Sequence, residues 1–212
     1  MKHCNHSGCG VAVRKETGLR KLTYFIACSL DGFIGDPEGD ATEMYRFVDE
    51  EFTEFLTAHY PETISTPGRR ALGLDHLENK RFDTVVQGRG SYDVALKEGI
   101  TSPYAHLRQY VASRGLTESP DPQVELITDD LIGKIRELKA ERGGLDIYLC
   151  GGAQLAGALF GEVDELVVKS YPFAYGTGMP MFASASGVRE FGLDEVRAFG
   201  NGVVVRTYGR KR

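Results

Sequence analysis

Short apolar runs of strand length recur along the chain and are separated by stretches in which apolar residues follow helical spacing. Runs of this kind, bounded by glycine or polar residues, are typical of strands buried in a sheet. Strands that alternate with helices predict a single α/β domain with a mostly parallel, twisted central sheet and helices on both faces. The predicted strands lie at 22–28, 83–87, 110–112, 124–127, 147–150 and 166–168.

Two further stretches complete the predicted fold. Apolar residues of one helical face recur between 44 and 56, with Asp49, Glu50 and Glu54 beside that face. These carboxylates either form a solvated face or border a pocket. Near the C-terminus, strand candidates flank residues 200–202, and the Asn-Gly pair there predicts an antiparallel hairpin at one edge of the sheet.

The segment 145–161 has the clearest local pattern of the chain. Its apolar run ends in Gly151 and Gly152, after which apolar residues recur at helical spacing up to residue 160. At such a junction the backbone can approach a ligand closely, and the first N–H groups of the helix carry a partial positive charge. The segment therefore predicts a site for an anionic group such as a cofactor phosphate. The alternative is a tight turn in which the glycines only supply backbone angles.

Two other predicted strands end in a short segment that holds an arginine and a serine. Ligands in open α/β sheets bind at the carboxyl ends of strands, and the planar donor fork of arginine suits phosphate. Neither the GxGxxG fingerprint nor the GxxxxGK[ST] loop occurs, so this hypothesis rests on position. The alternative for each arginine is an ion pair with a surface carboxylate. The two segments are Gly88-Arg89-Gly90-Ser91 and Ser113-Arg114.

The 212-residue chain has a net charge of −5, which does not favour a nucleic-acid partner because phosphate neutralisation requires clustered basic residues. No apolar run reaches the roughly 20 residues that cross a bilayer, so no membrane partner is expected. The N-terminus lacks the apolar core of a signal peptide, and we expect a cytoplasmic protein. Residues 1–20 are polar and aperiodic, which predicts a flexible extension before one domain at 21–212.

Four cysteines are too few for a disulfide framework in a chain of this size. Cys28 and Cys150 lie in predicted strands and are interpreted as small buried hydrophobic residues. Cys4 and Cys9 have neighbouring histidines, but their spacing matches no paired zinc scheme, so no metal site is expected.

Five segments of the chain carry motifs: 27–35, 87–92, 110–114, 151–155 and the late segment from Val163 to Phe182. Together and in this order, they resemble the dihydrofolate reductase-like superfamily. The most similar branch contains the C-terminal reductase domain of riboflavin-biosynthesis deaminase/reductases and its stand-alone relatives. Each motif is weak by itself, whereas five in sequence are specific, and the resemblance extends over about residues 21–208.

The resemblance implies an NADPH-dependent reductase with four groups of cofactor contacts. A contact with the adenosine 2′-phosphate would favour NADPH over NADH. Gly90 and Gly115 depart from the family pattern, which often has a larger residue and a threonine there. The resemblance places Gly151, Gly152, Ala153, Gln154 and Leu155 against the diphosphate and nicotinamide side, Gly88, Arg89 and Ser91 on phosphates, Ser113 and Arg114 on the 2′-phosphate, and Ala27, Ile34 and Gly35 beside the nicotinamide.

The resemblance also implies hydride transfer to a C=N or C=O of a small pterin- or pyrimidine-like heterocycle. Dihydrofolate reductases hold the pterin with a carboxylate on the first helix. None of the three carboxylates near that helix aligns with it, so folate is not the expected substrate. Asp31 is the candidate polar group beside the substrate, as a proton donor or an orienting acceptor. The alternative is a side chain that holds the Asp31-Gly32 turn.

A competing hypothesis is a nucleotide-binding regulatory or interaction protein that keeps the fold without turnover, and the lack of an assigned proton donor supports it. A weaker one is a non-enzymatic dimer whose glycine turns are purely structural. Relatives in this branch are frequently homodimers, and the apolar late strands offer an interface. The expected partners are therefore a small heterocyclic substrate and a second copy of the chain.

Overall fold

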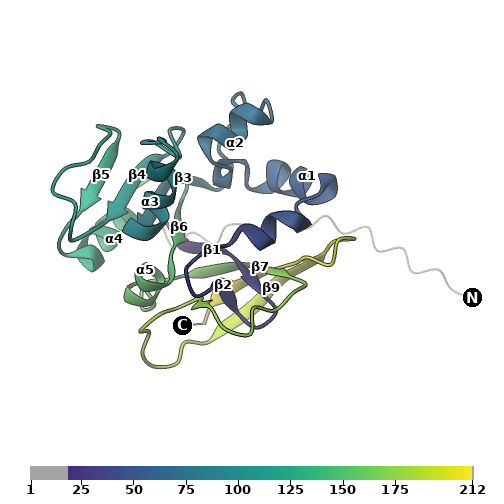
Figure 1. The fold of residues 1–212 in the computed structure, drawn as a ribbon. Coiled ribbons are helices and arrows are strands. Elements are labelled where there is room, and N and C mark those ends of the chain that lie inside the picture. The colour runs from purple at the N-terminus through teal and green to yellow at the C-terminus, as the bar shows by residue number, and fades with distance from the viewer. Residues whose placement is uncertain (1–18, 212) are drawn as a thin grey trace, which may run out of the picture.

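The computed structural model describes residues 19–211, in which an eight-stranded sheet runs through the centre of the molecule (Figure 1). Its strand order is β5-β4-β3-β6-β1-β7-β10-β9. The six strands from β5 to β7 are parallel, and β10 and β9 form an antiparallel hairpin at one edge, as the sequence predicts. The strands are β1 (Leu22–Ser29), β3 (Phe82–Gly88), β4 (Arg108–Ala112), β5 (Val124–Ile127), β6 (Asp146–Gly151), β7 (Glu165–Tyr171), β9 (Phe191–Ala198) and β10 (Val204–Arg210).

Helices cover both faces of the sheet, which confirms the predicted fold class. One core contains Phe52 and Phe55 of helix α1 (Glu50–His59), packed on Phe25 and Val85 of the sheet. The opposite core contains apolar residues of α4 (Leu131–Ala140) and α5 (Ala153–Ala158). The remaining helical segments are η1 (Thr42–Phe47), η2 (Pro61–Thr63), α2 (Thr66–Ala71) and α3 (Arg89–Lys97).

Helix α3 lies on the same face as α1. Its Tyr92 packs on Val111 and Val124, whereas Tyr110, the preceding residue on β4, belongs to the core under α4. Because successive residues of a strand point to opposite faces, α3 and α4 cover opposite sides of the sheet. Figure 1 shows α1 and α2 on one side of the sheet and α5 on the other.

The single helix predicted between residues 44 and 56 is wrong. Two helical segments occupy this stretch, the 3₁₀ segment η1 and the α-helix α1, and the chain is extended between them. The Asp49 side chain accepts a hydrogen bond from the Phe52 N–H at 2.9 Å and caps α1. An N-cap residue has non-helical backbone angles, so the helix begins at Asp49 although the apolar spacing continues through it.

A second, two-stranded sheet lies beside the large one. It pairs β2 (Phe33–Gly35), which follows β1, with β8 (Met179–Pro180), which follows β7. A Cβ at Gly178 would overlap the Gly35 carbonyl oxygen, so the close approach of these two segments requires glycine at this position.

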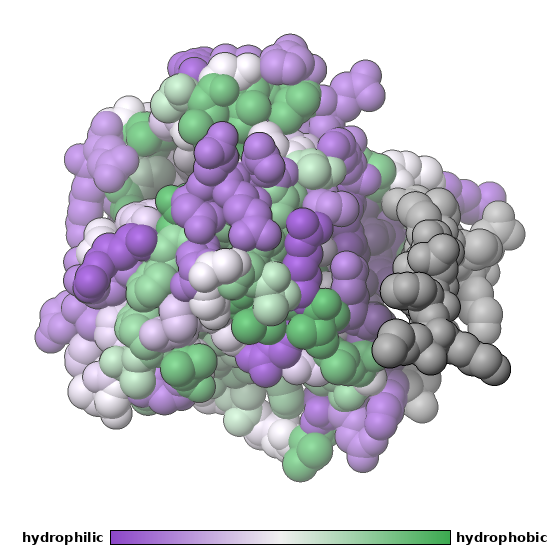
Figure 2. All heavy atoms as spheres, turned by 90° about the vertical axis from the view of Figure 1, so that its right-hand side faces the viewer, coloured by the Kyte–Doolittle hydropathy of each residue, from purple (hydrophilic) through white to green (hydrophobic). Residues whose placement is uncertain are grey.

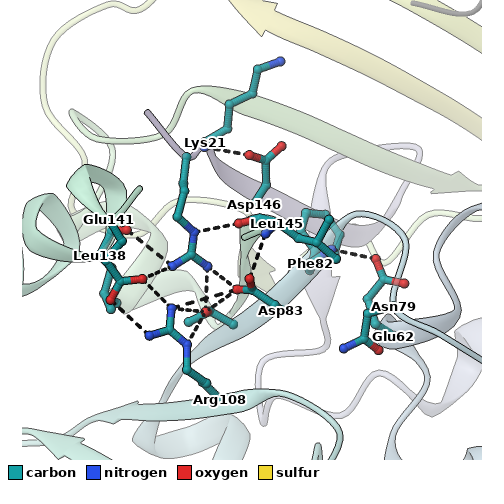
Figure 3. A network of polar contacts seen from close by, with 12 residues as sticks. Lys21, Glu62, Asn79, Phe82, Asp83, Arg108, Leu138, Glu141, Leu145 and Asp146 are labelled. Carbon is teal, nitrogen blue, oxygen red and sulfur yellow. Dashed lines mark hydrogen bonds and ion pairs between the residues drawn. The ribbon is translucent and has the colours of Figure 1, made fainter. Parts of the chain in front are cut away.

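The first described residues belong to the folded domain. Arg20 is 5% exposed and pairs with Asp83 and Glu141, while its Nε donates to the Leu145 carbonyl at 2.6 Å (Figure 3). Thr84 Oγ1 accepts from Arg20 Nη2 at 2.7 Å. This network joins the start of β1 to β3, β6 and α4. The predicted boundary at residue 20 therefore falls inside the folded part, whereas the rest of the predicted extension, with Cys4 and Cys9, lies outside the described residues.

The surface of the described residues mixes hydrophobic and hydrophilic groups, as the face in Figure 2 shows. Large apolar side chains that are exposed include Leu30 in the loop after β1, Val94 of α3, and Leu193 and Val196 of β9. Within residues 19–211, no helix has the length and apolar character needed to cross a membrane.

Candidate functional site

The carboxyl ends of β3 and β6 lie side by side in the middle of the sheet, and the place where the connections that follow them diverge is called the crevice. These strands are neighbours, but the helix that follows β3 covers one face and the helix that follows β6 covers the other. The two connections therefore diverge, and ligands of open α/β sheets bind at such topological switch points. The ends of β4 and β1 border the crevice on its two sides, since the strand order is β4-β3-β6-β1.

Glycines let the ends of β3 and β6 pack closely together at this crevice. A Cβ on Gly88 would lie 3.4 Å from both the Gly151 carbonyl oxygen and Leu155 Cβ. A Cβ on Gly152 would lie 3.8 Å from Ser91 Oγ and from Met179 Sδ. The predicted contact segments 88–91 and 151–155 therefore meet, and β8 joins them. Gly151 has φ +104°, a backbone conformation that glycine adopts without strain, and the Gly151–Gly152 peptide bond is cis.

Two helices begin at the crevice, each directly after a glycine, and the second is shorter than the sequence predicts. Helix α3 begins directly at Arg89, with Gly88 as its N-cap and no side-chain cap, so its first N–H groups stay available. Helix α5 ends at Ala158, before the predicted stop at Gly161, and spans six residues. The Ala183 backbone lies against Gly157, where a Cβ would overlap the Ala183 carbonyl. A helix this short adds little dipole to the site, so α3 is the better anion-binding end.

The arginine and serine positions lie at the ends of neighbouring strands. Arg89 is partly exposed, and its Nε pairs with Asp93 one turn along α3. This is the kind of ion pair with a surface carboxylate that the alternative interpretation predicts. The Ser113 hydroxyl accepts from the N–H groups of Gly115, at 3.3 Å, and Leu116, at 3.1 Å, and so shapes the turn after β4. Arg114 is exposed in that turn, and no residue within 19–211 forms an ion pair with it.

The predicted nicotinamide-side residues flank the crevice from β1 and β2. Ala27 is partly buried near the end of β1, and Ile34 and Gly35 form part of β2. Met179 connects this layer to the glycine corner, because its Cε lies 3.0 Å from the position of a Cβ on Gly39. The β2–β8 sheet therefore stands beside Gly152, next to the crevice.

Asp31 is held by the loop that follows β7. Its Oδ2 accepts from the Gly176 N–H at 2.7 Å, its Oδ1 accepts from the Tyr175 N–H at 3.2 Å, and the Ser29 hydroxyl also donates to Oδ1. The Ser29 hydroxyl and these backbone N–H groups hold the pKa of Asp31 below its ordinary value. A carboxylate with these contacts is a poor proton donor, and its geometry favours the structural alternative, a side chain that fixes the loop.

The carboxylates of α1 point away from the core. Asp49 caps the helix, and Glu50 and Glu54 are exposed. Glu51, which the sequence pattern does not single out, accepts from the Gly200 N–H at 3.2 Å in the β9–β10 turn. The solvated-face interpretation fits these positions.

Buried polar groups near the crevice escape the sequence analysis. The Gln87 side chain is 2% exposed, and its Nε2 finds no acceptor among the described residues. A buried donor without a partner is costly, so Gln87 marks a place where a polar ligand group would be stabilising. A second group, formed by Tyr104, Tyr148, Cys150 and Lys169, lies on the α1 face. Cys28 is buried as predicted, whereas Cys150 is only partly buried.

Two cavities formed by described residues lie elsewhere. One of about 250 Å³ is lined by the end of α1, by Lys80 and Arg81 before β3, and by Glu195 and Thr207 of the hairpin. A shallower one of about 380 Å³ lies along β5 and α4. Charged groups of both signs line each, and neither contains the glycine corners. The switch-point geometry is the stronger indicator of the site, because a groove for an extended cofactor is open along its length. Within residues 19–211, no group of three or more His, Cys, Asp or Glu side chains is placed to hold a metal ion.

The sheet order and the crevice define a dihydrofolate reductase-like α/β protein. Residues 20–205 match the family described as RibD C-terminal domain, and the chain belongs to that family. Two proteins of Bacillus subtilis (strain 168), described as the uncharacterized proteins YyaP and YwjB, are 26% and 25% identical. The matches cover 89% and 87% of this chain, and 94% and 95% of theirs.

Solved structures show the same fold. A putative riboflavin biosynthesis protein from Shewanella sp. PV-4 aligns with a TM-score of 0.67 at 24% identity, over 91% of this chain and 99% of that one. A diaminohydroxyphosphoribosylaminopyrimidine deaminase/5-amino-6-(5-phosphoribosylamino)uracil reductase from Thermotoga maritima aligns with a TM-score of 0.62 at 15% identity, over 91% of this chain and 57% of that one. These similarities confirm the family resemblance and the fold that the sequence predicts.

Proposed function

We propose that the protein is an NADPH-dependent reductase that delivers a hydride to a C=N or C=O of a small pyrimidine- or pterin-like heterocycle. The observation that carries the proposal is the meeting of segments 88–91 and 151–155 at the switch point, where helix α3 begins without a side-chain cap. Membership of the RibD C-terminal domain family supports an oxidoreductase role.

The residues at the crevice suit a phosphorylated dinucleotide. Gly88, Arg89 and Ser91 would hold phosphate through N–H groups, a guanidinium and a hydroxyl. Ser113 and Arg114 at the neighbouring strand end would hold the adenosine 2′-phosphate. Residues 151–155 would lie along the diphosphate and nicotinamide, with Ala27, Ile34 and Gly35 on the far side. When bound, the cofactor supplies the hydride, and the protein supplies position and exclusion of water.

The alternative is a protein that binds the nucleotide without turnover. The depressed pKa of Asp31 supports it, because the residue expected to donate a proton is held as a carboxylate by Ser29 and the loop after β7. If the protein is a reductase, the proton must come from a group other than Asp31 or from water.

Thermal unfolding of the purified protein with NADPH or NADH tests the proposal, because a ligand that binds only the native state raises stability by RT ln(1 + [L]/Kd). We expect NADPH to raise Tm more than NADH does at the same concentration. When NADPH is present at 100 times its Kd, the stabilisation should be about 2.7 kcal/mol. Oxidation of NADPH in the presence of pyrimidine or pterin acceptors would then establish the reductase. Binding without turnover favours the alternative, and no Tm shift with either nucleotide removes both.

We further propose a homodimer formed through strand β9. This edge strand is eight residues long, and its Leu193 and Val196 side chains are 57% and 53% exposed. Leu193 pairs with Tyr208 and Val196 with Arg206, so both lie on one face of the sheet. Sedimentation equilibrium of the wild type and of the double variant Leu193→Lys, Val196→Lys checks this. We expect the wild type to be a dimer and the double variant to be a monomer. The cytoplasmic location stays a prediction.

A further inference from the structure

A cavity of about 250 Å³ lies between the end of α1, the residues before β3 and the hairpin of β9 and β10. The crevice follows the last residue of β3, whereas Arg81, which lines the cavity, precedes the first. The length of this strand, roughly 20 Å, therefore separates the two places. At about 30 Å³ per water the cavity has room for about eight waters, so its size suits one small organic molecule.

The hairpin supplies one positive and one negative side chain to this cavity. Arg197 lies opposite Val205 in the strand register, and Val205 belongs to the core under α1, so Arg197 projects toward that helix. Glu195 lies opposite Thr207 and projects to the same side, because it is two residues from Arg197, roughly 7 Å along β9. Within residues 19–211, neither charged group forms an ion pair or a side-chain hydrogen bond.

Aromatic packing holds the Arg197 guanidinium in place without neutralising it. Its central carbon lies 4.9 Å from the centre of the Phe55 ring and 5.2 Å from the centre of the Phe199 ring. A guanidinium over a ring keeps its N–H donors for other partners, because they point outward in the plane of the group. The free donors suit a carboxylate, which can accept two parallel N–H bonds. A side chain that is already held also loses less freedom when a ligand binds.

The wall formed by the end of α1 and the residues before β3 adds further donors. Lys80 Nζ donates to the Ala58 carbonyl at 2.5 Å, and an ammonium has three N–H groups, so two remain. Arg81 pairs with the buried Glu165 and donates from Nη1 to the Tyr60 hydroxyl at 3.2 Å. Burial raises the pKa of Tyr60, so this hydroxyl keeps its proton. Lys80 is therefore the group on this wall that can take an anion.

These groups restrict the kind of ligand that fits. Glu195 only accepts hydrogen bonds, whereas Arg197 and Lys80 only donate them. A simple anion would meet the Glu195 carboxylate, and a simple cation would meet the Arg197 guanidinium. A molecule with a carboxylate and an ammonium on neighbouring atoms satisfies both residues of β9. A second carboxylate on the same molecule would neutralise Lys80.

We propose that this cavity binds a small dicarboxylic amino acid, with its α-carboxylate on Arg197, its α-ammonium on Glu195 and its side-chain carboxylate on Lys80. The site is separate from the crevice and does not depend on the reductase proposal. The amino acid and a nucleotide can therefore be bound at the same time.

L-Glutamate is a suitable probe, and glutarate is the matched molecule that keeps both carboxylates and lacks the ammonium. Each is titrated without NADPH into the ¹⁵N-labelled full-length protein, and the backbone amide signals are followed by NMR. We expect L-glutamate to shift the signals of residues 58–60, 80–81 and 195–207. It should bind at least about tenfold more tightly than glutarate, the value of one hydrogen bond between charged groups. Equal affinities, shifts confined to the crevice, or no shift with millimolar L-glutamate would overturn the proposal.

Variants of the two exposed side chains of β9 separate their contacts. We expect Arg197→Met to weaken L-glutamate about 10- to 100-fold. Glu195→Gln keeps the shape of the side chain and removes its charge, so it should abolish the preference for L-glutamate over glutarate. Arg142→Met, at an exposed position in the turn before β6, is the matched control and should leave L-glutamate affinity unchanged.

The NMR spectrum of each variant also reports whether the variant is folded. A preference for L-glutamate that persists in Glu195→Gln contradicts the assignment of the ammonium, and an equal loss in Arg142→Met contradicts a specific site. Both titrations omit NADPH, so failure of the cofactor proposal is seen separately in the Tm assay.

Discussion

Gly88 and Gly151 lie against each other at the carboxyl ends of adjacent strands, and a Cβ on Gly88 would lie 3.4 Å from the Gly151 carbonyl oxygen. The two strand ends therefore pack backbone to backbone where the helices after β3 and β6 turn to opposite faces. A peptide backbone without side chains lets a phosphate approach its N–H groups closely. Two glycine motifs that are weak evidence in the sequence are therefore adjacent in the structure and form one candidate site.

Substitution of Gly88 separates stability from ligand affinity. Gly88 has φ −80°, which alanine also adopts, and the added Cβ would make contacts of 3.4 Å with its neighbours. We expect Gly88→Ala to change the free energy of unfolding by less than about 1 kcal/mol and to weaken NADPH about tenfold or more, because the methyl group presses against Gly151 and Leu155 and shifts the two segments that would hold the phosphates. Gly161→Ala, where a Cβ meets nothing within 4 Å, is the control and should leave both unchanged. Equal NADPH affinity in both variants would count against a phosphate site at Gly88.

Arg114 tests the choice between the two nucleotides. The side chain is exposed after β4, so its removal should cost little stability. We expect Arg114→Ala to weaken NADPH about 10- to 100-fold, the value of a hydrogen bond to a charged group, and to leave NADH nearly unchanged. Fluorescence titration with both nucleotides measures this, with exposed Arg142→Ala in the turn before β6 as the matched control. Equal losses for NADPH and NADH would show that Arg114 does not contact the 2′-phosphate.

The Arg20 network predicts a stability effect far from the crevice. Removing Arg20 leaves Asp83, Glu141 and the Leu145 carbonyl without their shared donor. We expect Arg20→Met to lower the free energy of unfolding by about 1.5–3 kcal/mol, the value of a hydrogen bond to a charged group, since the Leu145 carbonyl loses its donor while Arg108 still pairs with Glu141. Urea denaturation measures the loss. Arg46→Met, which breaks a pair whose side chains are 72% and 55% exposed, should cost less than about 0.5 kcal/mol.

Lys169 makes stability depend on pH in a defined direction. Its pKa is about 8 in the folded protein and 10.5 when unfolded, so between these values the unfolded state binds more protons and stability rises with pH. Below pH 8 both states are protonated and the full penalty is present. We expect Lys169→Met to be more stable than the wild type by about 1–3 kcal/mol at pH 7, with the difference vanishing above pH 10.5. A constant difference across this range would contradict the low pKa.

The sequence predicts the sheet well, because each buried strand is a short apolar run bounded by turn residues. It predicts the hairpin from Asn201-Gly202 for the same local reason. It fails where one side chain overrides a longer pattern, as at Asp49, which ends the apparent helical period by capping α1. Arg20 also escapes prediction, because its partners lie 63 or more residues away in sequence.

The candidate site, like the fold, can be predicted from the sequence only in part. The glycine corners are visible in the sequence because glycine marks backbone conformation directly. The contacts of Asp31 depend on where the loop after β7 lies, which no local pattern contains. Lys169 follows the predicted strand 166–168, and its place beside the Phe25 ring emerges only when β1 and β7 are paired.

The place of β6 in the sheet has a consequence for biosynthesis. This strand pairs with β3 on one side and β1 on the other, yet it is translated after β5. While a ribosome is still making the first 145 residues, β1 and β3 each keep an open edge, and exposed edges invite pairing with other chains. Folding of the domain therefore waits for β6, and a nascent chain stalled before it is the species that chaperones must protect from aggregation.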